Sequence, residues 1–231
     1  MKLELDWEMG LFRGLRALWR KLAPAPPPHF DPARAALLVD HQRALTVIAQ
    51  VVAGEPVRVL PARSVGGVRG RDLLLPPYLD LGPDPASNRE LYIVRVALSA
   101  AIYRLRSRVP LPNARWELVL EGLRMARTAA LWLEQEMPSF TVAHEVAIAL
   151  ALASRPSLDR LHGQERLLEA ARRTALEGGA PWADQALRKA LEQASTGGPE
   201  SPGTSIWGEL IPCTQEAPAE GEAGSASTEP S

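Results

Sequence analysis

The chain has 231 residues, of which 46% are hydrophobic, and this length can bury the core of one large domain or two small ones. The 26 basic and 27 acidic residues give a formal net charge of −1, so overall charge does not favour a nucleic-acid-binding protein. One cysteine, Cys213, excludes an internal disulfide and a cysteine-built zinc site.

Residues 1–23 are predicted to form an amphipathic N-terminal helix, followed by a proline-rich linker at 24–30. At helical spacing, Leu11, Phe12, Leu15, Leu18, Trp19 and Leu22 share one face, flanked by Arg13, Arg16, Arg20 and Lys21. We interpret Phe12, Leu15, Trp19, Arg13, Arg16 and Arg20 as residues that bind a protein partner or a membrane surface. The alternative is that this face packs on the rest of the chain.

The chain start has no secretory signal pattern, and no apolar run approaches the roughly 20 residues that would span a bilayer. We therefore expect a cytoplasmic protein, with peripheral contact at the inner membrane if the N-terminal helix binds lipid.

Residues 31–195 are predicted to form one helical domain. Asp31 and Pro32 are suited to begin a helix that ends at Gly54. The runs 57–60 and 72–75 predict a β-hairpin near 57–76, because both are apolar and surround a glycine-rich turn region. Prolines at 61, 76 and 77 end these strands or confine them to a sheet edge.

Five further helices complete the predicted domain. Ser87 and Glu90 have capping-box spacing before a helix that is apolar on most faces, which we expect to be central and most buried. The remaining predicted starts are Asn113, Ser139, Ser157 and Pro181, and Gly178–Gly179 would end the helix capped by Ser157. The expected fold is mainly α, a multi-helix bundle of about six core helices with one small β-hairpin.

Residues 196–231 are rich in Gly, Pro, Ser and Glu, so we expect a disordered acidic tail. The segment 205–212, SIWGELIP, is an apolar exception within this tail. Such a segment is expected to dock on its own domain or on a partner.

The motifs of common active sites are incomplete in this sequence. His144 and Glu145 begin like an H-E-x-x-H zinc helix, but Ile148 stands where the second histidine is needed. We expect His144 and Glu145 to lie at a helix surface or to make a buried hydrogen bond. The glycines of GGVRGRD lack the Lys-Ser/Thr ending of a phosphate-binding loop, and no G-x-S-x-G is present. These observations favour a protein that is not an enzyme and needs no metal or cofactor.

Two short stretches carry a resemblance to a known family. A leucine-rich strand closes in proline at Leu75 and Pro76, and after a gap Asn88 precedes the pair Leu91–Tyr92 at the start of an alanine-rich helix. Later, Trp207 and Gly208 begin the sequence WGELIP, which leads into an acidic low-complexity stretch. In their helical context, these features resemble the N-terminal helical region of NorD- and CbbO-type activator proteins, over residues 30–212.

The resemblance implies partners for the chain. NorD- and CbbO-type proteins act with MoxR-class AAA+ ATPases to activate metalloenzymes, nitric oxide reductase in one branch and Rubisco in the other. Their helical region precedes a von Willebrand factor A domain whose D-x-S-x-S motif binds a divalent cation. This sequence has no D-x-S-x-S, so that metal site is not carried over, and the A domain is expected on a separate protein or is lost.

For the matching residues the resemblance implies structural roles. Asn88 is expected at the helix entrance, Tyr92 against the Pro76–Pro77 corner, and Trp207 in docking of the tail. Leu75, Leu91 and Gly208 complete the matched set.

The function implied is that of a non-catalytic accessory or adaptor protein in denitrification. It would help a MoxR-class AAA+ ATPase activate or mature a metalloenzyme client, such as a membrane-bound nitric oxide reductase. The alternative from another class is a helical DNA- or effector-binding regulator. The arginines are spread over many predicted helices and interleaved with glutamates, which argues against a recognition helix for DNA.

Overall fold

The computed structural model describes residues 31–62, 66–106, 112–194 and 209–210. Over these ranges the protein is mainly helical with a small sheet, as the sequence predicts, and it has six α-helices. Their bounds are α2 Leu38–Ala53, α3 Pro85–Leu105, α4 Arg115–Glu136, α5 Pro138–Ser154, α6 Gly163–Leu176 and α7 Gln185–Gln193. The predicted helix at 1–23 and the linker at 24–30 lie outside the described residues.

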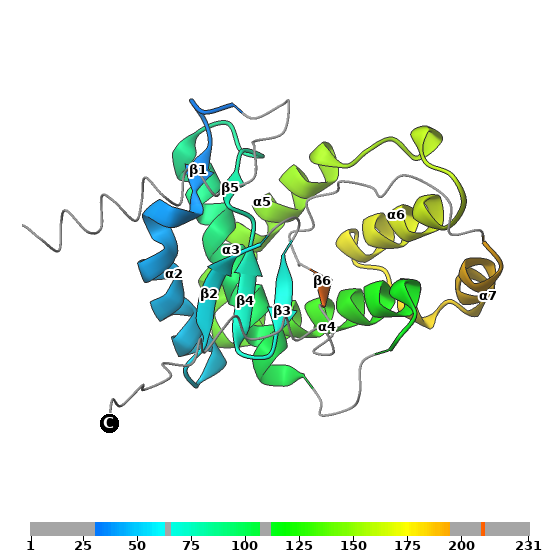
Figure 1. The fold of residues 1–231 in the computed structure, drawn as a ribbon, viewed down its shortest axis with the longest axis horizontal. Coiled ribbons are helices and arrows are strands. Elements are labelled where there is room, and N and C mark those ends of the chain that lie inside the picture. The colour runs from blue at the N-terminus through cyan, green and yellow to red at the C-terminus, as the bar shows by residue number, and fades with distance from the viewer. Residues whose placement is uncertain (1–30, 63–65, 107–111, 195–208, 211–231) are drawn as a thin grey trace, which may run out of the picture.

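Helix α3 is the centre of the fold, as its apolar composition predicts. It packs against α2, α4 and α5 and also against the sheet, and most of its residues are buried. In Figure 1 the sheet lies in front of α3, α2 lies on the left, and α6 and α7 form the right end. A helix contacted on every side has little room for polar residues, which explains its composition.

The start of α3 differs from the predicted capping box. The N-cap is Asp84, whose carboxylate accepts the backbone N–H of Ser87 at 2.8 Å, and Pro85 occupies the first helical position. Hydrogen bonding to the backbone N–H of Ser87 lowers the pKa of the Asp84 carboxyl below its usual value. The prediction that Ser87 caps this helix is wrong. Asp84, three residues earlier, supplies the capping acceptor, and Pro85 is a favourable first residue.

The main sheet has the strand order β2-β4-β3-β6. Its strands are β2 Arg58–Pro61, β3 Gly67–Arg69, β4 Asp72–Leu75 and β6 Glu209–Leu210. The predicted hairpin of 57–60 with 72–75 is wrong, because β2 and β4 run parallel, with Arg58 opposite Asp72. The hairpin is instead formed by β3 and β4, which are antiparallel and joined through Gly70 at φ +55°. The glycine-rich stretch read as a turn contains a third strand.

A second sheet has two strands, of which the first, β1, directly precedes α2. Strand β1, Ala36–Leu37, pairs antiparallel with β5, Tyr78–Leu79. The prediction that Asp31 begins the first helix is wrong, because Ala36 and Leu37 are extended and α2 begins at Leu38. The helix ends as expected at Gly54, which is left-handed at φ +75°.

Both outer edges of the main sheet are covered. At the β2 edge, two side chains of α2 donate to backbone carbonyls: Gln42 to Val59 of β2 at 2.7 Å, and Gln50 to Val57, just before β2, at 3.2 Å. The other outer strand is β6, which pairs in parallel with β3 and contacts α4. Pairing or capping an edge satisfies backbone groups that would otherwise attract another strand.

The helices after α3 begin and end differently from the predicted signals. The caps of α4 and α5 are Ala114 and Met137, and neither makes a side-chain capping bond, so Asn113 and Ser139 are not caps. Ser157 caps a short 3₁₀ turn, η1 Leu158–Arg160, and α6 begins only at Gly163. Pro181 opens a second 3₁₀ turn, η2 Pro181–Ala183, and Asp184 then caps α7 by accepting from Ala186 and Leu187.

Most of the tail at 196–231 lies outside the described residues. Glu209 and Leu210 are described, and they form strand β6. Their parallel pairing with β3 satisfies their backbone groups and attaches them to the chain's own sheet. They belong to the predicted docking segment 205–212.

Candidate functional site

The matched motif residues hold the corner between β4 and α3. The Tyr92 hydroxyl donates to the backbone carbonyl of Pro76 at 2.7 Å, and the side chain is fully buried. Burial raises the pKa of the Tyr92 phenol far above its usual value, so the group remains a neutral donor. This is the anchor that the sequence predicts for Tyr92. Leu75 and Leu91, on either side of the corner, lie in the hydrophobic core.

Asn88 lies at the entrance of α3, as expected, and binds backbone groups of three residues in two segments. It accepts the N–H of Gly82 at 2.7 Å and donates to the carbonyls of Arg34 at 2.8 Å and Asp84 at 3.1 Å. The residue is completely buried. Asn88 therefore fixes the β5–α3 loop and the segment before β1 to the first turn of the helix, which is a structural role.

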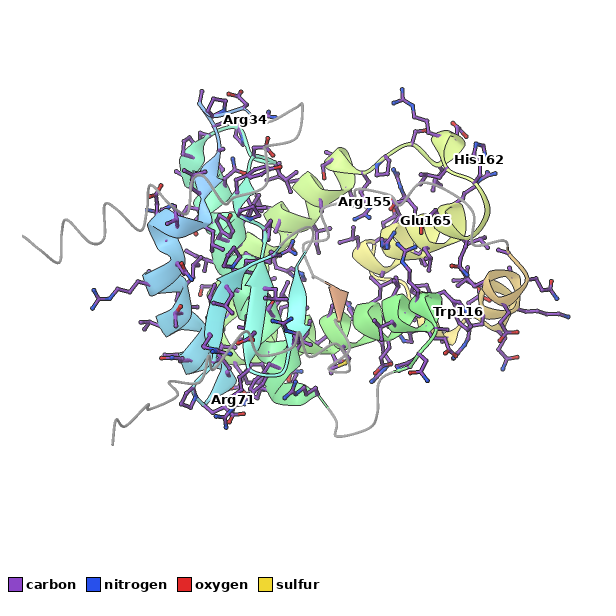
Figure 2. All side chains as sticks on the ribbon, viewed as in Figure 1. Arg34, Arg71, Trp116, Arg155, His162 and Glu165 are labelled. Carbon is purple, nitrogen blue, oxygen red and sulfur yellow. The ribbon has the colours of Figure 1, made fainter. Side chains whose placement is uncertain are left out.

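A buried ion cluster joins α6 to the end of α5. The guanidinium of Arg155 makes a bidentate pair with the carboxylate of Glu169, whose side chain is 0% exposed. Arg173 lies 3.4 Å from the same carboxylate and donates to the Pro156 carbonyl at 2.8 Å, while Arg172 lies 3.8 Å from it. A second pair, Arg115 with Glu165, joins α4 to α6. Figure 2 shows Arg155 and Glu165 on the same side of the molecule, by α6.

The chemistry of the ion cluster is that of a structural support. The carboxylate of Glu169 faces three guanidinium groups, so its oxygens are engaged in ion pairs within the cluster. Arginine keeps its charge in proteins and therefore cannot serve as the acid. These pairs hold neighbouring helices together.

His144 makes the buried hydrogen bond that was one of its two expected placements. Its Nδ1 lies 3.2 Å from Glu134 Oε1, and its ring stacks on Phe140 at a centroid distance of 5.1 Å. Burial lowers the pKa of His144, and the nearby Glu134 carboxylate opposes this shift only in part. Glu145 is exposed. Over the described ranges no three His, Cys, Asp or Glu side chains come together in an arrangement that could hold a metal ion.

Helix α5 leaves one apolar side exposed, which we call the outer α5 face. Its inward side consists of Phe140, His144, Ala147 and Ala151. The opposite side has the same spacing and consists of four exposed residues, Val142, Val146, Ala149 and Ala153. The valines are 67% and 54% exposed. The only Asp, Glu, Lys or Arg in α5 is Glu145, so this helix is apolar on both sides.

The remaining predicted site residues cannot be placed. Those of the N-terminal helix, namely Phe12, Arg13, Leu15, Arg16, Trp19 and Arg20, lie outside the described residues, as do Trp207 and Gly208. Among the described residues, no helix is long and apolar enough to cross a membrane. The binding roles assigned to these residues remain predictions.

Sequence reasoning missed the ion cluster and the outer α5 face. Glu169, Arg172 and Arg173 have the i, i+3 and i, i+4 spacings that signal ion pairs on a helix, but spacing does not reveal burial. The largely apolar composition of α5 was visible, but which side remains exposed depends on its neighbours. Comparison of the chain with models of protein families, with curated proteins and with solved structures found no match.

Proposed function

We propose that this chain is a non-catalytic adaptor that binds a MoxR-class AAA+ ATPase and a metalloenzyme client of the nitric oxide reductase type. The observation that supports an adaptor is the outer α5 face, and the sequence resemblance supplies the class of partner. The proposed place of action is the cytoplasm, at the inner membrane when the client is membrane-bound.

The outer α5 face has the properties of a protein-binding surface. A helix that is apolar on all sides is normally enclosed by protein, yet Val142 and Val146 are mostly exposed. Covering the face would gain about 25 cal/mol for each Å² of apolar surface removed from water. The small side chains of Ala149 and Ala153 leave room for close approach by a partner helix.

The polar interior supports an adaptor over an enzyme. Glu169 and Glu165 are held by arginines, Tyr92 by a backbone carbonyl, and Asn88 by backbone groups of three residues. Active sites instead arrange titratable groups around a space for substrate. In the part of the chain that the structure describes, these buried polar groups link helices and loops to one another.

A capture experiment tests the proposal. The tagged full chain is co-expressed with a MoxR-class ATPase and the subunits of a nitric oxide reductase, and captured partners are quantified. Val142→Lys/Val146→Lys should reduce capture at least about tenfold, because two charges would be buried against the partner. The matched control, Val47→Lys/Val51→Lys, changes two exposed valines of α2 at the same spacing and should capture as the wild type does.

Two results would refute the proposal. Capture that is equal in both variants would remove the outer α5 face as the binding surface. If the wild-type chain captures neither partner and reductase activity is normal without the gene, the adaptor function itself is wrong.

A further inference from the structure

One end of the molecule gathers arginines from several elements. The last turns of α2 and α3 meet there, because Arg104 donates to the Val52 carbonyl at 3.2 Å. The turn between β3 and β4 joins them, because Arg106 donates to the Gly70 carbonyl at 3.1 Å. We call this region the arginine end, formed by Arg58, Arg69, Arg71, Arg104 and Arg106. In Figure 2 Arg71 lies at the bottom of the molecule, and Arg34 lies at the top.

Positive charge exceeds negative charge at the arginine end. Asp72 lies between Arg58 and Arg69 on neighbouring strands, 2.7 Å and 3.7 Å from their guanidinium nitrogens. Glu55 lies 3.6 Å from Arg71. Among the described residues these are the two carboxylates that pair with the five arginines, so three positive charges are in surplus. The whole chain has a net charge of −1, so this end differs in sign from the average of the chain.

The two arginines at the end of α3 are positioned by uncharged groups. The guanidinium of Arg104 lies 5.1 Å from the centre of the Trp132 ring, and that of Arg106 lies 4.4 Å from the centre of the Tyr103 ring. Aromatic rings and backbone carbonyls orient a guanidinium without neutralising it. Within the described ranges neither arginine forms an ion pair, and both are exposed, so their charge can act on an anion from solution.

The arginine end is open to solvent and also carries aliphatic side chains. The side chains of Arg58 and Arg71 are 71% and 66% exposed. Leu105 in the last turn of α3 is 38% exposed, and Val51 in the last turn of α2 is 74% exposed. A lipid surface suits this combination, because its headgroups attract the arginines and its interface accepts aliphatic groups. A nucleic-acid backbone would contact the arginines but would offer no apolar surface to Leu105 and Val51.

We propose that the arginine end binds the phosphate headgroups of an anionic lipid surface. Guanidinium groups form paired hydrogen bonds with phosphate oxygens. Each basic residue near such a surface strengthens binding about fivefold. The surplus of three charges therefore predicts attachment that is reversible and sensitive to salt. This inference does not depend on the proposed function, because it requires no protein partner.

Flotation of the purified full chain with lipid vesicles tests the inference. At about 50 mM salt, the wild type should float with vesicles of equal parts phosphatidylglycerol and phosphatidylcholine, but not with vesicles of phosphatidylcholine alone. Arg71→Gln/Arg106→Gln should weaken binding to the anionic vesicles at least about tenfold.

The matched control is Arg34→Gln/Arg89→Gln, which removes the same charge at the other end of α3. Arg89 lies near the start of that helix, and the backbone of Arg34 is bound there by Asn88. The two side chains are 42% and 54% exposed. This variant should float as the wild type does. Circular dichroism checks that both variants are folded, which is expected because the four side chains are not buried.

Other outcomes overturn the inference. Equal losses in the two variants would show that overall charge, and not the arginine end, attracts the vesicles. A wild type that does not float, that floats equally with phosphatidylcholine alone, or that matches Arg71→Gln/Arg106→Gln excludes the site. Release from the vesicles by duplex DNA at the same phosphate concentration would assign the arginine end to nucleic acid instead.

Discussion

The hydroxyl of Tyr92 and the carbonyl of Pro76 form a buried hydrogen bond of 2.7 Å that joins the first turns of α3 to the end of β4. Pro76 cannot extend the β4 ladder because it lacks a backbone N–H. Its carbonyl is nevertheless buried and needs a donor. Tyr92 supplies that donor, so the strand can stop in the protein interior.

Tyr92→Phe should lower the free energy of unfolding by about 1–3 kcal/mol, because it leaves the Pro76 carbonyl buried without this donor. The matched control is Tyr103→Phe, which removes a 2.6 Å hydrogen bond to the partly exposed carboxylate of Glu55. Water can replace that donor, so the control should cost about 1 kcal/mol or less. Urea unfolding of both variants measures the difference, and equal losses would contradict the anchor.

Glu169→Gln should destabilise the fold by about 3–5 kcal/mol, because it leaves the buried guanidinium of Arg155 without its counter-charge. Glu121→Gln removes a carboxylate that forms an equally short pair with Arg124 at the surface. This control should cost less than about 1 kcal/mol, since water solvates the exposed arginine. Chemical denaturation compares the two, and a small loss for Glu169→Gln would show that the cluster is dispensable.

Gly66→Ala should prevent folding or cost more than about 3 kcal/mol. Gly66 has φ +90°, and a Cβ there would lie 2.2 Å from the carbonyl oxygen of Leu74. Gly70 also has a positive φ, +55°, but its Cβ would meet nothing within 4 Å. Gly70→Ala should therefore cost only about 1–2 kcal/mol for the left-handed backbone. Soluble yield and thermal unfolding distinguish the two, and similar values would refute the close approach at Gly66.

Acidification should weaken the fold through His144, whose pKa is lowered by burial. The unfolded chain, with a histidine pKa of about 6.5, binds the proton more readily than the folded chain. The contribution of neutral His144 to stability is therefore complete above about pH 6.5 and is lost as the pH falls through the folded-state pKa.

The His144→Gln variant tests this assignment. It should be less stable than the wild type at neutral pH, but it should lose less stability than the wild type between about pH 7.5 and pH 5. Glu134→Gln should enlarge the loss, because the Glu134 carboxylate is the group that raises the pKa against burial. Urea unfolding across the pH range gives both slopes. An unchanged slope in His144→Gln would exclude His144 as the source.

Local sequence patterns determined the helices and the strands at 57–60 and 72–75, but they did not signal the short strands β1, β3 and β5. The left-handed glycine at 54 ended α2, apolar positions on every side made α3 the central helix, and Pro76 ended β4. Each of these outcomes depends on neighbours within a few residues, which a single sequence displays directly. The contact of Tyr92 with the Pro76 corner was expected from the family resemblance and not from a local pattern.

Tertiary contacts decided the rest. The parallel pairing of β2 with β4 depends on β3 entering the sheet between β4 and β6, and no local signal in 57–76 specifies that order. Arg155 and Glu169 lie 14 residues apart on different elements, so only the packing of α6 against the end of α5 makes them a buried pair. Helix α5 packs against α3, α4 and α6 through its buried side, which leaves Val142 and Val146 exposed, because burial depends on which neighbours a helix has and not on its own composition.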